Sequence, residues 1–207
     1  MMFWLYELLG LSLIIGMAVS LIIAIIVGIG IDYLLYRPLR SSGAPPFVIF
    51  VASMGTLIAL QQVIHLVFHP DPKTVSGITR KVISLGDVTF TSLHLIIVVV
   101  SWVLVLALIL FLNKTKLGKA IRAVSNNPEM AEIVGIGHQK IFSLAYGIGS
   151  ALVAVAGILY LFDKAATPEM GPWAIFTAFI AVFIGGIGSM GGAALGGLII
   201  GLAENIG

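Results

Sequence analysis

Five long apolar runs, each free of Asp, Glu, Lys and Arg, constrain this chain more than any other feature of its sequence. The first run, residues 8–31, is 24 residues long. A helix needs about 20 mostly apolar residues to cross a bilayer. The whole chain is 59% hydrophobic and only 10% charged, whereas a soluble domain carries about 25% charged residues. The sequence therefore predicts an all-α integral membrane protein.

The five runs predict five transmembrane segments in a single membrane domain. We expect them at residues 8–31, 47–68, 93–112, 141–162 and 174–203. The last one is unusual, because its centre reads GGIGSMGGAALGGLIIG over residues 185–201. Dense glycine weakens a helix and admits irregular backbone where protein covers it. One long span and a broken or re-entrant segment are both compatible with this run.

Small residues recur at helical spacing in the last two runs. Side chains this small let two helix backbones approach closely in a membrane. We therefore expect a helix-packing role for Gly147, Ser150, Ala154, Gly157, Gly188, Gly192 and Gly196.

A few polar residues interrupt the apolar runs. Such groups face neighbouring helices or a water-filled path, and interhelical hydrogen bonds explain them as well as contact with a solute does. The candidates for a substrate path are Ser53, Thr56, Gln61 and Ser189. His65 and His69 share one helical stripe with Gln61, but no carboxylate or third ligand is near, so we expect no metal site. The chain has no cysteine and therefore no thiolate chemistry.

The connections between the runs predict the orientation. A polar excursion at residues 70–92 contains Lys81–Leu85 and Val88–Thr91 around Gly86-Asp87, which is typical of a small hairpin. One side of the membrane collects seven basic residues: Arg37, Arg40, Lys114, Lys116, Lys119, Arg122 and Lys140. The other side collects four: Lys73, Arg80, Lys81 and Lys164. The positive-inside rule places the seven in the cytoplasm and the hairpin outside.

The longest polar break, residues 113–140, reads NKTKLGKAIRAVSNNPEMAEIVGIGHQK. Leu117, Ile121 and Val124 share one face of a first short helix. Asn127 as N-cap, Pro128 at the first helical position and Glu129 predict the start of a second helix, which should stop at Gly135. A basic loop of this kind can be a simple topological anchor, or it can offer a two-helix surface to a soluble partner.

Four motifs in order resemble the permease subunits of bacterial branched-chain amino acid ABC transporters. They are YRPLR (residues 36–40), LGKAIRAVSNNPEMAEIVGIG (117–137), AVAGIL (154–159) and the glycine-rich run at 185–201. The resemblance implies that 113–140 is a coupling segment that docks on a cytoplasmic ATPase. The positions carried over for that role are Arg122, Pro128, Glu129, Ala131 and Gly135.

The same resemblance implies a second permease subunit, two ATPase subunits and an extracytoplasmic solute-binding protein, in the inner or plasma membrane. By the same resemblance ATP and Mg would be bound by the partner ATPase, which agrees with the absence of a Walker-type motif in this chain. The chain itself would bind no cofactor, catalyse no reaction and contact lipid rather than nucleic acid, consistent with a net charge of only +2. Permeases of this family are longer, so we expect the chain to be truncated at both ends.

Alternative functions remain open at this point. The solute could be urea, a short amide or a sugar instead of an amino acid. A self-contained secondary transporter would want a carboxylate inside the membrane, yet the acidic residues here lie in loops or at the ends of the runs. A membrane-embedded enzyme would want a cluster of His, Asp and Glu within the spans, which the sequence does not show.

Overall fold

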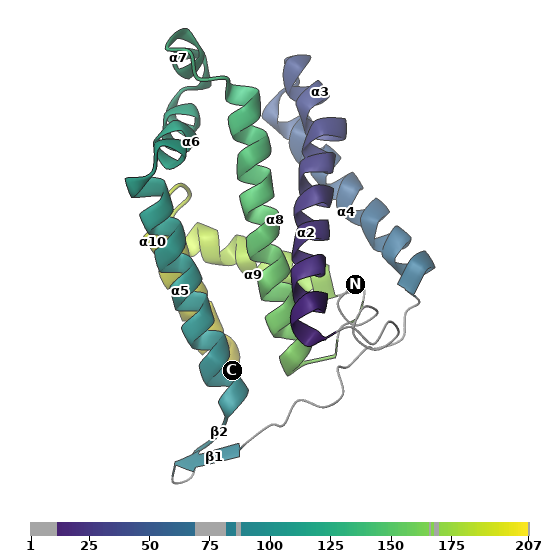
Figure 1. Cartoon of the computed structure of the whole chain (residues 1–207), viewed down its shortest axis with the longest axis vertical. Coiled ribbons are helices and arrows are strands. Elements are labelled where there is room, and N and C mark those ends of the chain that lie inside the picture. Colours follow the sequence, from purple (N-terminus) through teal and green to yellow (C-terminus); the bar gives the residue numbers. More distant parts are fainter. Residues whose placement is uncertain (1–11, 69–81, 86–87, 166, 168–169, 207) are drawn as a thin grey trace.

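The computed structural model describes residues 12–68, 82–85, 88–165, 167 and 170–206. Figure 1 shows its helices and strands. The order is α2 (Leu13–Ile31), a π-helical turn η1 (Asp32–Tyr36), α3 (Arg37–Ser41), α4 (Pro46–Phe68), β1 (Val82–Leu85), β2 (Val88–Thr91), α5 (Ser92–Lys114), α6 (Lys116–Asn126), α7 (Pro128–Ile133), α8 (His138–Asp163), α9 (Met170–Gly185) and α10 (Met190–Ile206).

The prediction of an all-α membrane protein is confirmed. Within the described residues, four helical stretches are long and apolar enough to cross a membrane: Leu13–Ser41, Pro46–Phe68, Ser92–Lys114 and His138–Asp163. They contain the first four expected spans, apart from residues 8–12, of which 8–11 lie outside the described part. The strands β1 and β2 pair antiparallel, with Val82 opposite Thr91 and Leu85 opposite Val88, so the expected hairpin is present as well.

The glycine-rich fifth segment is broken. It forms α9, of 16 residues, and α10, of 17 residues, joined by a turn at residues 186–189. At 1.5 Å per residue each helix is about 25 Å long, which is short of a hydrocarbon core of about 30 Å. Gly186 and Gly188 both have φ of +91°, a backbone conformation that residues with a side chain rarely adopt. These two glycines therefore end the helix where one straight span would have continued.

The α9 and α10 backbones touch each other. A Cβ added at Gly192 would lie 1.8 Å from the carbonyl oxygen of Gly185, and one added at Gly185 would lie 2.0 Å from that of Gly192. A Cβ at Gly196 would lie 2.1 Å from the carbonyl oxygen of Ala181. Glycine is thus the only residue that permits this pairing.

The α2 and α8 helices form the second close pair and lie side by side in Figure 1. A Cβ added at Gly28 would lie 1.8 Å from Ser150 Oγ, and one added at Gly147 would lie 3.2 Å from Ile29 Cδ1. Ile158 and Leu161 form a small buried core at the far end of this pair. By contrast, none of the α4 residues is buried.

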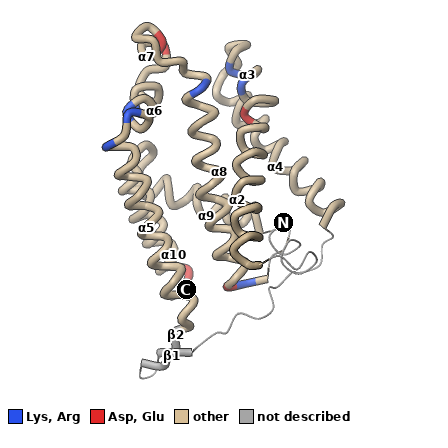
Figure 2. Tube along the Cα trace, viewed as in Figure 1, with Lys and Arg blue, Asp and Glu red and all other residues tan. Residues whose placement is uncertain are grey.

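The charged side chains divide the molecule into two ends. All described lysines and arginines except Lys164 gather around α3, α6 and the start of α8 (Figure 2). We call this the basic end, defined by Arg37, Arg40, Lys114, Lys116, Lys119, Arg122 and Lys140. The strands β1 and β2 lie at the opposite end (Figure 1). Lys73, Arg80 and Lys81 are outside the described residues.

Candidate functional site

Segment 113–140 folds locally, as its sequence indicates. Thr115 Oγ1 accepts a hydrogen bond from Gly118 N at 2.9 Å, which caps α6. Asn127 Oδ1 accepts one from Met130 N at 3.0 Å, which caps α7, and Pro128 follows at its first position. Gly135 has φ of +86°, and the next amide, Ile136 N, donates to Ala131 O at 2.9 Å. The predicted pair of short helices is confirmed. The second helix is capped by Asn127 and followed by the left-handed turn at Gly135, as the sequence indicates.

The segment is anchored to the bundle through small and apolar residues. A Cβ at Gly118 would lie 2.4 Å from Leu112 Cα and from Phe111 O, so α6 sits directly on the end of α5. Val124 and Ala131 are each only 3% exposed. Close packing of this kind fixes α6 and α7 relative to the membrane helices.

The outer surface of α7 carries exposed apolar side chains, although it lies at the tip of the basic end (Figure 1). Met130 is 61% exposed, Ile133 77% and Val134 72%. Glu129 is exposed beside them. Glu132 Oε2 lies 3.0 Å from Nδ1 of His138, the first residue of α8. We call Met130, Ile133 and Val134 the α7 face.

The residues carried over from the family resemblance are distributed over both sides of the segment. Ala131 is buried, whereas Glu129 and Pro128 are exposed. Gly135 forms the left-handed turn after α7. Arg122 Nη1 donates to Asn113 Oδ1 at 3.1 Å, which ties α6 back to α5.

A buried ionic network joins η1 and α3, which continue α2 as one helical stretch, to α8 at the basic end, and sequence reasoning did not find it. Asp32 has 0% of its surface exposed. Arg40 Nη2 donates to Asp32 Oδ1 at 2.6 Å, and Ser143 Oγ donates to Asp32 Oδ2. Arg40 Nη2 also lies 3.4 Å from Gln139 Oε1, which accepts from it. We call Asp32, Arg40, Gln139 and Ser143 the Asp32 network.

The π-helical turn and aromatic rings shape this network. A π turn locally widens a helix and often occurs at functional positions; here it begins at Asp32 itself. The Arg40 guanidinium carbon lies 4.6 Å from the ring centroid of Phe142. The Tyr36 and Tyr146 rings stack at 5.1 Å with an interplanar angle of 13°. The pocket around the charges is therefore walled by aromatic rings from both helices.

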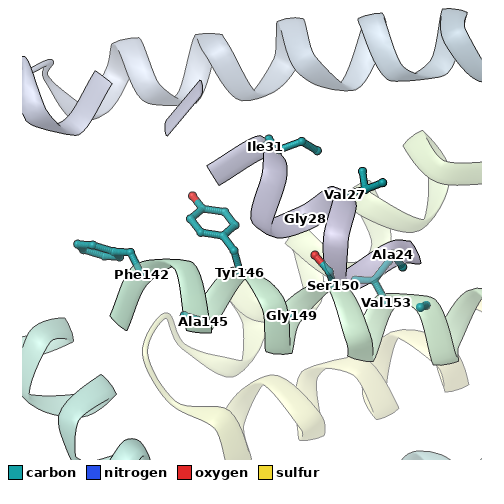
Figure 3. Close-up of a pocket in the computed structure, with 11 residues that line it drawn as sticks. Ala24, Val27, Gly28, Ile31, Phe142, Ala145, Tyr146, Gly149, Ser150 and Val153 are labelled. Atoms are coloured by element: carbon teal, nitrogen blue, oxygen red, sulfur yellow. The ribbon is translucent and has the colours of Figure 1, made fainter. Parts of the chain in front are cut away.

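An open groove of about 660 Å³ runs between α2 and α8. Figure 3 shows the Tyr146 and Ser150 side chains extending from α8 toward α2. The other walls are mostly aliphatic. The lining residues are Ala24, Val27, Gly28, Ile31, Phe142, Ala145, Tyr146, Gly149, Ser150, Val153 and Ala154. We call this the α2/α8 groove.

A second groove, of about 510 Å³, lies between α2, η1 and α4 and includes Thr56 in its lining. Thr56 is the one predicted path residue that lines either groove, and its hydroxyl donates to Ala52 O of its own helix at 2.8 Å. Ser53 likewise donates to Phe50 O at 2.6 Å, and Gln61 is half-buried. Ser189 Oγ accepts from Gly192 N at 3.1 Å, so it caps α10.

The residues expected to serve helix packing fall into three groups. Gly147 and Ser150 face α2, and Gly192 and Gly196 face α9. Ala154 lines the α2/α8 groove. No described atom lies within 4 Å of a Cβ added at Gly157 or at Gly188, and Gly188 belongs to the turn before α10.

Comparison with known proteins identifies the class. The family model described as branched-chain amino acid transport system / permease component matches residues 1–207. The chain belongs to this family, and it is a multi-pass protein of the cell membrane.

Named relatives agree. The chain is 32% identical over 203 residues to the high-affinity branched-chain amino acid transport system permease protein BraD of Pseudomonas aeruginosa. The aligned residues cover 95% of this chain and 66% of BraD. The chain is 31% identical over 195 residues to the permease protein LivH of the corresponding Escherichia coli system (91% and 63%). A probable LivH of Methanocaldococcus jannaschii is 31% identical over 206 residues (98% and 65%). The chain thus spans about two thirds of the length of these relatives, and no solved structure matches it.

Proposed function

We propose that the chain is the membrane-spanning permease subunit of an ATP-driven importer for branched-chain or other amino acids. In this proposal segment 113–140 is cytoplasmic and docks on an ATPase subunit. The observation that carries the proposal is the α7 face, because three large apolar side chains of α7 and its C-cap are exposed at the basic end, while Ala131 of the same helix is buried. Exposed apolar patches bordered by polar residues mark protein interaction sites.

Docking there would act directly on the membrane helices. Ala131 is buried beneath the α7 face, and only residues 134–137 separate α7 from α8. The Glu132–His138 contact bridges that gap. A displacement of α7 by the ATPase would therefore be passed to the first turn of α8, which forms one wall of the α2/α8 groove.

The α2/α8 groove suits a solute with an aliphatic side chain. Its walls are mostly aliphatic, and Ser150 and Tyr146 supply hydroxyl groups for the polar part of such a solute. A second permease subunit would complete the path, and an extracytoplasmic binding protein would deliver the amino acid. ATP and Mg would be bound by the ATPase partner, so this chain would be a transport subunit and not an enzyme.

The docking role is tested by placing a charge in the α7 face. Ile133→Asp, made in the complete transport system, should lower leucine uptake and retention of the ATPase about thirtyfold, because an interface hot spot is worth about 2 kcal/mol or more. Ser125→Asp adds the same charge at an exposed position of α6 and is the matched control. Equal uptake in both variants would refute docking through α7. Uptake of a sugar or of urea in place of leucine would refute the amino acid assignment.

The orientation is tested with a single thiol. The chain has no cysteine, so Glu129→Cys creates a unique reactive site at the exposed α7. A membrane-impermeant maleimide should label it in inverted vesicles and leave it unlabelled in intact cells. Labelling in intact cells would place the segment outside and overturn the proposal.

A further inference from the structure

We propose that Asp32 is a positioning residue of the transport cycle, which, with Arg40, ties α2 to the first turns of α8. Displacement of α7 would then move both walls of the α2/α8 groove together. This inference rests on the proposed function, since it concerns how movement reaches the groove. Three observations support it: the position of the Asp32 network, its burial, and the close packing of α2 against α8 that exists without it.

The network lies where a movement of α7 would enter the bundle. α8 begins at His138, whose ring is in contact with Glu132 of α7. Gln139 and Ser143, which hold Arg40 and Asp32, lie in the first two turns of the same helix. The α2 side of the network is therefore attached to the part of α8 nearest to α7.

The network also lies at one end of the groove. Ile31, a lining residue, directly precedes Asp32, and Tyr146 is one turn beyond Ser143. Tyr146 stacks on Tyr36 of η1, which adds a second attachment between the same two stretches. If α8 moved without α2, these contacts would break and the groove would change width at this end.

Stability alone does not explain why the α2/α8 pair contains the Asp32 network. A buried ion pair seldom stabilises a protein more than apolar residues of the same volume would. The α2 and α8 helices already pack through Gly28 against Ser150 and through Gly147 against Ile29. The network adds hydrogen bonds with a defined geometry. Asp32 Oδ1 accepts from Arg40 of the same helical stretch, and Asp32 Oδ2 accepts from Ser143 of α8. Hydrogen bonds of this kind fix the register between two helices, which apolar packing leaves freer.

The test separates positioning from folding by using variants of graded severity. Ser143→Ala removes the bond from α8 but leaves Asp32 paired with Arg40. The double variant Asp32→Asn, Arg40→Gln neutralises both charges, so no charge is left buried alone. The controls are Ser20→Ala, whose hydroxyl bonds to Gly16 O of its own helix, and Arg37→Gln, whose side chain is exposed.

Each variant is assembled with its ATPase, second permease and binding protein in proteoliposomes. We expect the double variant to lower both leucine uptake and the stimulation of ATP hydrolysis by loaded binding protein about tenfold, within the usual range of coupling free energies. Ser143→Ala should give a smaller loss in the same direction. Basal ATP hydrolysis and the amount of assembled complex should stay at the control level.

A cross-link between α2 and α8 then tests whether the double variant loses stimulated hydrolysis because the two helices are no longer attached. Ile29→Cys and Gly147→Cys place two thiols at an existing contact between α2 and α8, in a chain with no other cysteine. Oxidation should restore stimulated hydrolysis in the double variant, and reduction should abolish it again. Unchanged stimulation in the double variant, a parallel loss of assembly and basal hydrolysis, or failure of the cross-link to restore stimulation would each overturn the inference. An unaltered chain that takes up no leucine would instead refute the proposed function.

Discussion

The α2/α8 pair and the α9/α10 pair solve the same problem in different ways. Both bring two helices into close contact inside an apolar chain, and both place glycine at the contact. In α9/α10 glycine meets backbone: Gly185 faces Gly192, and Gly196 faces Ala181. In α2/α8 glycine meets side chains, Gly28 facing Ser150, and an ionic network is added at one end.

The difference shows what each kind of contact is suited to do. Lipid chains are as apolar as leucine, so membrane helices associate through close packing and hydrogen bonds and not through the hydrophobic effect. Backbone-to-backbone contact allows no adjustment, because neither partner has a side chain that can rotate away. Contact through side chains is specific, but a side chain can rotate to relieve a new neighbour. We therefore expect α9/α10 to be a fixed pair that tolerates no substitution at the contact, and α2/α8 to be an adjustable pair whose side chains can adapt while the Asp32 network holds the register of the two helices.

The largest effect should come from removing the cation of the Asp32 network. Arg40→Ala leaves a fully buried carboxylate without its partner, and breaking a buried pair in this way costs about 3–5 kcal/mol. The free energy of unfolding in detergent, measured by SDS titration, reports the loss. Arg37→Ala is the control, since Arg37 lies over the exposed Tyr33 ring at 5.2 Å and such a contact is worth about 0.5–1 kcal/mol. Equal losses in the two variants would show that the pairing of Arg40 with Asp32 contributes no more to stability than an exposed contact does.

The next effect concerns the fixed pair. Gly192→Ala inserts a methyl group 1.8 Å from the Gly185 carbonyl oxygen, and overpacking of this kind costs about 1–3 kcal/mol. Gly191→Ala, one residue earlier, meets no described atom within 4 Å and should gain up to about 1 kcal/mol of helix propensity. Opposite signs of the two changes in unfolding free energy are expected. If Gly192→Ala also stabilised the protein, the backbone contact between α9 and α10 would be wrong.

A similar change in the adjustable pair should cost less. Gly28→Ala places its methyl group 1.8 Å from Ser150 Oγ and 2.7 Å from Ser150 Cβ. The hydroxyl can rotate away but the Cβ requires a small shift of the helices, so we expect a loss of about 1–2 kcal/mol. Removing that side chain in the double variant Gly28→Ala, Ser150→Gly should restore part of the loss, beyond what the single changes predict. Gly30→Ala, which meets no described atom within 4 Å, is the control. Strict additivity would show that Gly28 and Ser150 do not touch.

The smallest effect belongs to segment 113–140, which is held by local bonds. Asn127→Ala removes the cap of α7 and should cost about 1 kcal/mol. Amide hydrogen exchange of Met130, whose N–H the Asn127 side chain accepts, should rise accordingly. Asn126→Ala, one residue earlier and also exposed, should leave that exchange rate unchanged. A similar rise in both variants would contradict the capping assignment.

The sequence is informative where structure is set by neighbouring residues. The start of α7 was predictable because Asn127 and Pro128 act within a single turn, and its end because Gly135 needs a positive φ. The glycine-rich run indicated a weak helix but left open whether it breaks, since that depends on which glycines contact α10 and which adopt a left-handed turn.

Contacts between distant residues were not predictable. Asp32 directly follows the apolar run 8–31, a position typical of the polar end of a span, and nothing next to it in the sequence indicates burial. Its partners are eight and 111 residues further along the chain, and a single sequence gives no sign that Ser143 faces it. The one available signal was an acidic residue immediately after a long apolar run, followed by Arg40 within YRPLR. Ser189 was interpreted as a path residue for a related reason: its capping role depends on a break that the sequence did not settle.

The short α9/α10 hairpin has a consequence for how the protein is threaded through its membrane. α8 ends, and α10 also ends, away from the basic end (Figure 1). A pair of helices that enters and leaves the membrane on the same side does not change the side on which the neighbouring segments lie. The hairpin therefore has no effect on the orientation of the other helices. Its length and glycine content can therefore change without reversing which compartment α7 faces.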